Sequence, residues 1–116
     1  MPKFFFLQYV DEAIAPKPGT PELQAQVDAY AKLFEEVSAA GILRGGDPMQ
    51  PSAAAFCVQV RDGQTKVTDG LMHKEAPGLN GYWVWECKDR AEAEAWAARI
   101  PAAQNGTVQV HPIWEM

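Results

Sequence analysis

The sequence predicts an α+β protein in which two helices pack on one side of an antiparallel sheet. Two observations lead to this fold class. The patterns along the 116 residues run strand, helix, strand, then a hairpin, then strand, helix, strand. An Asp-Gly pair at Asp62-Gly63 lies between two strand-like runs, which is a strong hairpin signal. Right-handed crossovers place both helices of such a split β-α-β unit on the same face, and the length fits one domain over residues 1–116.

The first predicted strand covers residues 3–10, KFFFLQYV. Both of its alternating faces are apolar, which indicates that both faces are covered in the folded protein. Residues 11–19 contain two prolines and a glycine and are predicted to form a loop.

A first helix is predicted to begin at Thr20-Pro21-Glu22, because these residue types suit the N-cap, the first helical position and the positive end of the helix dipole. Gly41 is expected to end it as a left-handed C′ residue. Apolar residues recur along it at spacings of four and three and predict its buried stripe. They are Leu23, Val27, Tyr30, Phe34 and Val37.

The central part of the chain is predicted to be mostly strand. Residues 42–46 form a short strand or edge segment, and residues 47–52 form a turn. Residues 53–60 alternate in polarity and pair with residues 65–68 through the Asp-Gly turn, so these two strands are antiparallel.

The strand GYWVWEC at residues 81–87 again has two largely apolar faces, with Glu86 the exception. A second helix is predicted from Asp89, with Glu92 completing a capping box and Pro101 ending it. Its predicted buried residues are Ala93, Trp96, Ala97 and Ile100. Residues 101–106 are predicted to be a loop, and residues 107–116 the closing strand, in which Pro112 favours an edge or a strand end.

Two helices on one side leave the other apolar face of the sheet uncovered. A bare face of this kind exceeds the few hundred Å² of apolar surface that a monomer usually tolerates. A symmetric homodimer that packs sheet on sheet hides it, and we therefore expect the chain to have itself as a partner.

Composition narrows the function classes. Hydrophobic residues make up 47% and charged residues 22%, as in an ordinary globular protein, and the net charge of −5 disfavours nucleic acids and anionic membranes as partners. The apolar N-terminal run is too short for a bilayer span and lacks a signal-peptide cleavage site. Cys57 and Cys87 are interpreted as buried free thiols, which favours a cytoplasmic location. No CxxC or HxxxH spacing occurs, and no metal or other cofactor is predicted.

Four segments resemble the YCII-related superfamily, specifically its DGPF-domain branch. They are AGILRGGDPMQP, VQVRDGQTKVTDG, GYWVWE and AARIPAAQNGTVQVHPIWEM. The resemblance implies a ferredoxin-like α+β fold that dimerises through its sheet, the dimeric α/β-barrel arrangement. For function it implies two roles: an enzyme, suggested for the wider superfamily from a histidine-aspartate pair in a pocket, or a regulatory role beside extracytoplasmic-function sigma factors.

The name-giving motif of that branch is altered here. Asp69 and Gly70 match it, but Leu71 and Met72 stand where proline and phenylalanine are expected. The N-terminal half contains no histidine, so the dyad of the enzyme-like branch cannot be transferred to this chain.

Asp69 and His73 are the candidate catalytic residues. Asp69, at a strand end beside Gly70, could act as a general base or grip a ligand, or its carboxylate could simply bond its own turn. His73 titrates near neutral pH and could act as acid or base, or be a solvated surface residue.

Tyr82 and Trp83 could form the wall of a ligand pocket or fill the core and the dimer interface. Glu12 and Arg44 could reach the same cleft from neighbouring loops, by analogy with the fold. Two hypotheses follow. One is a homodimer that binds a small molecule near Asp69, with acid-base catalysis as an extension; the other is a non-catalytic interaction module linked to sigma-factor control.

Overall fold

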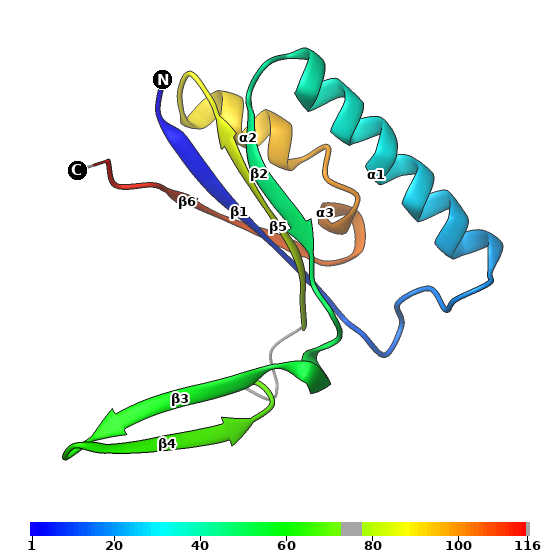
Figure 1. The fold of residues 1–116 in the computed structure, drawn as a ribbon. Helices are drawn as coiled ribbons and strands as arrows, with labels where there is room; N and C mark the ends of the chain where they lie inside the picture. The colour runs from blue at the N-terminus through cyan, green and yellow to red at the C-terminus, as the bar shows by residue number, and fades with distance from the viewer. Residues whose placement is uncertain (73–77, 116) are drawn as a thin grey trace.

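The computed structural model of the protein describes residues 1–72 and 78–115. Figure 1 shows their path from the N-terminal strand to the C-terminal strand. The elements are β1 (Lys3–Val10), α1 (Pro21–Ala39), β2 (Leu43–Pro48), the 3₁₀ turn η1 (Ser52–Ala54), β3 (Phe56–Arg61), β4 (Gln64–Asp69), β5 (Gly78–Glu86), α2 (Arg90–Ala97), α3 (Ala102–Asn105) and β6 (Thr107–Pro112).

Four strands form one antiparallel sheet in the order β2-β5-β1-β6. This is the strand order of a split β-α-β unit and is consistent with a ferredoxin-like fold. Helices α1, α2 and α3 lie on the same side of the sheet, as Figure 1 shows. The predicted element order and the one-sided placement of the helices are therefore confirmed.

Helix α1 begins and ends where the sequence predicts. The Oγ1 of Thr20 accepts a hydrogen bond from the backbone N–H of Leu23 at 3.2 Å, and Pro21 occupies the first turn. Gly41 follows the C-cap residue with φ +72°, a left-handed conformation that glycine adopts without steric cost.

The predicted buried stripe of α1 was partly wrong. Leu33 and Val37, one turn apart, face the core, whereas Val27 and Phe34 are 51% and 53% exposed. Apolar residues at spacings of four and three occur on two neighbouring faces of this helix. The face that carries Leu33 is the one that packs against the sheet. Phe34 is left beside a hollow in the surface, described below.

Helix α2 carries the predicted cap. Asp89 Oδ1 accepts from the N–H of Glu92 at 2.9 Å, and Glu92 Oε1 accepts from the N–H of Lys88 at 3.2 Å. The helix ends at Ala97. The loop predicted for residues 101–106 was wrong over α3, Ala102–Asn105, which follows Pro101 at φ −51° because the proline ring fixes a helical φ.

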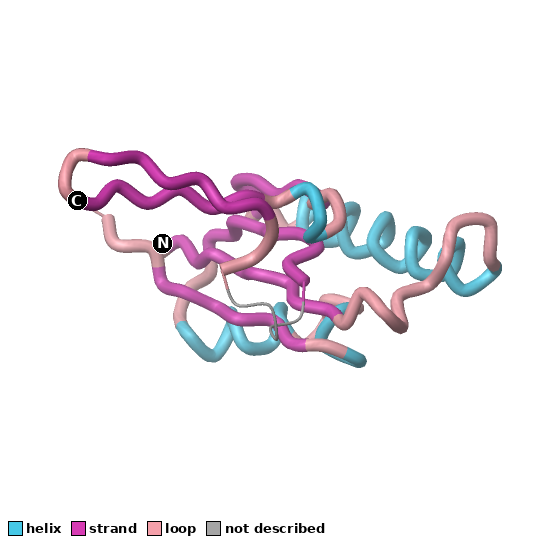
Figure 2. Tube along the Cα trace, turned by 90° about the horizontal axis from the view of Figure 1, so that it is seen from below, coloured by secondary structure: helices cyan, strands magenta, loops and turns pink. Residues whose placement is uncertain are grey.

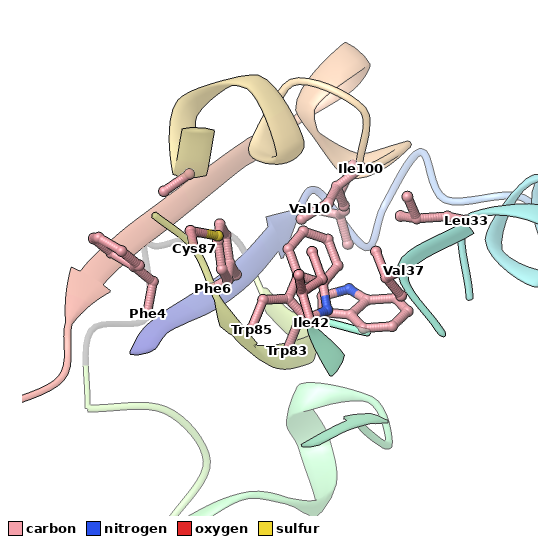
Figure 3. Close-up of a cluster of buried hydrophobic side chains, with 12 residues drawn as sticks. Phe4, Phe6, Val10, Leu33, Val37, Ile42, Trp83, Trp85, Cys87 and Ile100 are labelled. Atoms are coloured by element: carbon pink, nitrogen blue, oxygen red, sulfur yellow. The ribbon is translucent and has the colours of Figure 1, made fainter. Parts of the chain in front are cut away.

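The core lies between the helices and the sheet face beneath them. Figure 3 shows its side chains, with Trp85, Phe6 and Ile100 fully enclosed. Among residues 1–72 and 78–115, the buried apolar residues of this core are Phe4, Phe6, Val10, Leu33, Val37, Ile42, Trp83, Trp85, Cys87, Ala93, Ile100 and Ala102. Cys87 is fully buried as predicted, but Cys57 is only half-buried, because its strand lies outside this core.

The opposite face of the sheet has no helix over it among the described residues. Side chains alternate along a strand, so Phe5, Leu7 and Tyr9 of β1 and Tyr82 and Val84 of β5 point to this face. They are half-buried, and we refer to these five residues as the open face.

Strands β3 and β4 pair only with each other and project away from the sheet as an arm, as Figures 1 and 2 show. Asp62 at φ 53° and Gly63 at φ 75° form its turn, which confirms the predicted Asp-Gly hairpin. One face of the arm is apolar: Phe56, Val58, Val60 and Val67 are each more than half exposed.

Candidate ligand-binding cleft

A cleft of about 440 Å³ lies between α1 and the β2–β5 side of the sheet. Its roof is the face of α1 that carries Gln26, Tyr30 and Phe34. Its floor and walls come from β1, β2 and β5 and the residues at their ends. These are Gln8, Gly46, Asp47, Pro48, Asn80, Gly81, Tyr82 and Trp83.

Two glycines keep the floor of the cleft free of side chains. A Cβ added to Gly46 would lie 3.0 Å from the Trp83 ring and 3.0 Å from the Tyr82 carbonyl oxygen. A Cβ added to Gly81 would lie 3.0 Å from the side-chain nitrogen of Gln8. Larger residues here would fill the space under α1, so the hollow depends on these two positions.

The back of the cleft is a hydrogen-bonded group around Gln8, which is 4% exposed. Gln8 Nε2 donates to the hydroxyl of Tyr30 at 3.2 Å and to Oδ1 of Asn80 at 3.0 Å. Trp83 Nε1 donates to Gln8 Oε1 at 2.5 Å. A buried amide must be bonded to be tolerated, and here both hydrogens and the oxygen of the amide have partners.

A β-bulge places Asn80 in this group. The register between β1 and β5 shifts between Gln8 and Tyr9, and Asn80 is the residue of β5 without a partner on β1. A bulge re-aims a side chain, and such irregularities are frequent beside binding sites. The bulge lets Asn80 bond Gln8 on the helix side of the sheet.

The two tyrosines of the lining differ in their surroundings. Burial raises the pKa of Tyr30, opposed by the backbone of Ala102 and by Gln8, so its hydroxyl keeps its proton at neutral pH. The Tyr82 hydroxyl donates to Asp47 Oδ2 at 2.8 Å, and this hydrogen bond and the Asp47 charge raise the pKa of Tyr82. The ring centroids of Tyr82 and Phe5 are 5.5 Å apart. The Tyr82 ring therefore faces the open face, behind the cleft floor, although Tyr82 is one of the lining residues.

Of the residues predicted from the sequence, Tyr82 and Trp83 line the cleft. Glu12 and Arg44 do not. The carboxylate of Glu12 accepts the N–H of Ser52 at 3.1 Å and so ties the first loop to η1. Arg44 pairs with Glu86 at 2.9 Å at the sheet edge.

Asp69 and Gly70 lie at the base of the arm and are not part of the cleft lining. Asp69 is exposed at the end of β4, opposite Phe56. Gly70, at φ +93°, donates its N–H to the carbonyl of Ala55 at 2.7 Å and closes the arm. His73 lies outside the described residues, so the predicted roles of Asp69 and His73 stay predictions.

Gln8, Tyr30, Asp47 and Asn80 were not among the predicted site residues. A signal for Gln8 exists in the sequence: it falls in phase with Phe4, Phe6 and Val10 on the buried face of its strand. A polar residue in such a position needs buried partners. The sequence gives no comparable signal for Asn80, because its role depends on the bulge.

No group of three or more His, Cys, Asp or Glu side chains that could hold a metal ion occurs among residues 1–72 and 78–115. In the same residues, none of the helices has the length and apolar character that a membrane crossing requires.

Comparison with known proteins shows the family to which this chain belongs. The family model of the YCII-related domain matches residues 3–116, nearly the whole chain. The protein belongs to the YCII-related family. No curated protein sequence matches it.

One similar solved structure is 5-chloro-2-hydroxyhydroquinone dehydrochlorinase from Burkholderia phenoliruptrix AC1100, in complex with 2,5-dihydroxybenzoquinone. The match has 14% sequence identity and a TM-score of 0.50, and it covers 97% of this chain and 93% of that one. At this identity the likeness shows a shared fold and leaves the chemistry open.

Proposed function

We propose that this protein binds a small organic molecule in the cleft between α1 and the sheet. The carrying observation is the buried amide of Gln8, hydrogen-bonded to Tyr30, Asn80 and Trp83, at the back of a hollow. Ligand sites are typically concave, mostly apolar and supplied with a few converging polar groups, in volumes of roughly 300–1,000 Å³. Phe34, Pro48 and the indole of Trp83 supply the apolar walls.

A ring compound bearing oxygen substituents is our first candidate ligand. The flat aromatic walls favour a planar molecule, because stacked and edge-on ring contacts stabilise it beyond the area that it buries. The structural neighbour with the same fold was solved with 2,5-dihydroxybenzoquinone, which supports the choice of this class as the starting point.

The binding test compares Gly46→Val with Gly45→Val. Valine at 46 would crowd the ring of Trp83 and fill the cleft, whereas a Cβ at 45 meets only Val84, at 3.8 Å. Isothermal titration calorimetry against a panel of hydroxylated ring compounds, including 2,5-dihydroxybenzoquinone, should show binding that Gly46→Val weakens at least about tenfold and Gly45→Val leaves intact.

Phe34→Ala provides a second probe if Gly46→Val does not fold. Phe34 is half exposed, so its removal should cost little stability while it takes away part of the cleft roof. Equal ligand affinity in the wild type and in both cleft variants would rule out this cleft as the site.

Catalysis is a further part of the proposal. Asp69, although it is not part of the cleft lining, would act with His73 in acid-base chemistry on the bound molecule, as the sequence predicts. The test is turnover of any bound compound in Asp69→Ala and His73→Ala; unchanged turnover in both variants would remove these residues from the mechanism.

We also propose that the functional unit is a homodimer formed through the open face, in the dimeric α/β-barrel arrangement of the DGPF branch, and that it is cytoplasmic. The accessible surface of the chain supports the dimer. It is 8178 Å², about 1,900 Å² more than the roughly 6,300 Å² expected of a compact monomer of 12.8 kDa.

An excess of this size is what an obligate dimer would hide, because such interfaces bury roughly 2,000–5,000 Å² over both partners. We propose that the dimer also covers the apolar face of the arm, because an isolated two-stranded hairpin is marginally stable in water. Each protomer has one arm and one open face, so a two-fold dimer can cover both at once. The comparisons offer no support for the alternative, a sigma-factor-linked interaction module.

A further inference from the structure

We propose that the cleft recognises an acceptor oxygen on its ligand, with the Tyr30 hydroxyl and the Asn80 amide as the two hydrogen-bond donors. The ligand class is then a planar ring compound that carries a ketone or a delocalised oxyanion. This inference rests on the proposed function, because it names the ligand class of the same cleft.

The indole N–H of Trp83 determines which groups donate and which accept in the hydrogen bonds around Gln8. An indole N–H can only donate, so the atom of Gln8 that lies 2.5 Å from it must be the amide oxygen. This contact fixes the orientation of the Gln8 amide, which could otherwise be drawn either way round. Gln8 is 4% exposed, so its amide is held by these protein partners.

The nitrogen of Gln8 therefore points to Tyr30 and Asn80 and uses both of its hydrogens there. Asn80 must accept through its oxygen, which leaves its NH₂ group directed elsewhere. The Tyr30 oxygen also accepts, so its own hydrogen remains available to donate. Among the hydrogen bonds of the described residues, none is donated by the Tyr30 hydroxyl or by the Asn80 NH₂ group.

Both donors belong to residues that line the cleft. The burial that raises the pKa of Tyr30 also keeps its hydroxyl protonated, and hence a donor, at neutral pH. The carboxylate of the described lining, Asp47, is directed toward the Tyr82 hydroxyl behind the floor, where its Oδ2 accepts at 2.8 Å. The side-chain amide of Gln26 carries both a donor and an acceptor, so it does not change the excess of hydrogen-bond donors in the lining.

The charge of the described lining also restricts the ligand. It contains no lysine or arginine, so a localised carboxylate or phosphate would lose its hydration without gaining a cation. A ketone or a delocalised oxyanion loses less on leaving water, and its two lone pairs match two donors. The aromatic walls hold the ring that carries this oxygen.

The experiment compares 1-indanone with indane, two probes that share a ring skeleton and differ in one carbonyl oxygen. Binding is followed by NMR titration of the Trp83 indole N–H signal. The preference for 1-indanone over indane is measured in the wild type and in Tyr30→Phe, with Tyr9→Phe as the matched control. Tyr9 is on the open face, so its variant loses a phenol hydroxyl away from the cleft.

Tyr30→Phe should lower the preference for the ketone by about 2- to 10-fold, the effect of one hydrogen bond, and Tyr9→Phe should leave it unchanged. Asn80→Asp keeps the oxygen that Gln8 needs but replaces the donor with an acceptor. It should weaken 1-indanone binding at least as much, with indane binding retained.

Equal losses for both probes, or an unchanged preference in Tyr30→Phe and Asn80→Asp, would overturn the donor assignment. Failure of the proposed function looks different: the wild type binds neither probe, or Gly46→Val binds both as well as the wild type does.

Discussion

Gln8 illustrates what a single residue contributes to this protein. On the buried face of β1 it stands among Phe4, Phe6 and Val10, and it would weaken the core if its amide had no partners. Its hydrogen bonds to Tyr30, Asn80 and Trp83 instead join the sheet to α1 at the back of the cleft. The Gln8 side chain therefore contributes both to the stability of the core and to the hydrogen-bonded group at the back of the cleft.

Cys87 gives a prediction at the residue scale. Burial, with smaller contributions from Glu92 and Asp89, raises the pKa of its thiol from the ordinary 9.0 to about 11. The unfolded chain therefore releases this proton first, and the stabilising contribution is complete below pH 9 and is lost as the pH rises toward 11.

The measurement is urea unfolding between pH 7 and 11 in a Cys57→Ala background. Stability should fall above pH 9 by up to about 1.4 kcal/mol per pH unit more than in Cys57→Ala/Cys87→Ala. Parallel pH profiles for the two proteins would show that Cys87 does not titrate in this way.

A local pattern in the sequence singled out two residues that the structure places in the cleft lining, and their role there stays a prediction. Trp83 and Tyr82 were singled out because they alternate in an aromatic strand. The contacts of Asn80 and Tyr30 join residues 72 and 22 positions from Gln8, and no local pattern encodes such distances. Glu12 and Arg44 were chosen by analogy with the fold, and their contacts are with Ser52 and Glu86.

Caps and turns explain why most elements begin and end as predicted. Thr20, Asp62-Gly63 and Asp89 act through bonds and dihedral angles within a few residues of themselves. The face that α1 buries depends on packing, because Leu33 is held by the core. The helix at Ala102–Asn105 combines the helical φ of Pro101 with the burial of Ile100 and Ala102. The sequence therefore predicts element boundaries better than it predicts which face is buried.

The cap of α2 gives a prediction at the element scale. Asp89→Ala removes the acceptor of the Glu92 N–H and should destabilise the protein by about 1 kcal/mol. Thermal unfolding of this variant is compared with that of Asp28→Ala, which removes an exposed carboxylate from the middle of α1. A similar small change in both variants would contradict a specific capping role.

The shape of the whole molecule differs from that of a compact monomer. Its radius of gyration is 16.0 Å, against about 13 Å expected for a folded chain of this length. The arm and the open sheet account for this shape, which Figure 2 shows from below. The sequence predicted the bare face from its apolar alternation but not the projection of the arm, because nothing local shows that β3 and β4 leave the sheet.

The proposed dimer gives a prediction at the scale of the whole molecule. Val58 is on the apolar face of the arm and its neighbour Gln59 is on the other. Val58→Asp should weaken dimerisation at least about tenfold, because it buries a charge, and Gln59→Asp should have little effect. Sedimentation equilibrium measures both; a wild-type chain that stays monomeric at micromolar concentration would contradict the proposal.

The central claim is that the hollow between α1 and the sheet is the binding site of this YCII-related protein. A crystal structure in complex with the ring compound that binds best tests it most directly. We predict the ring between Phe34 and the floor at Gly46 and Gly81, with its oxygen beside Tyr30 and Asn80. A ligand seated against Asp69 at the base of the arm, with this cleft empty, would contradict the account.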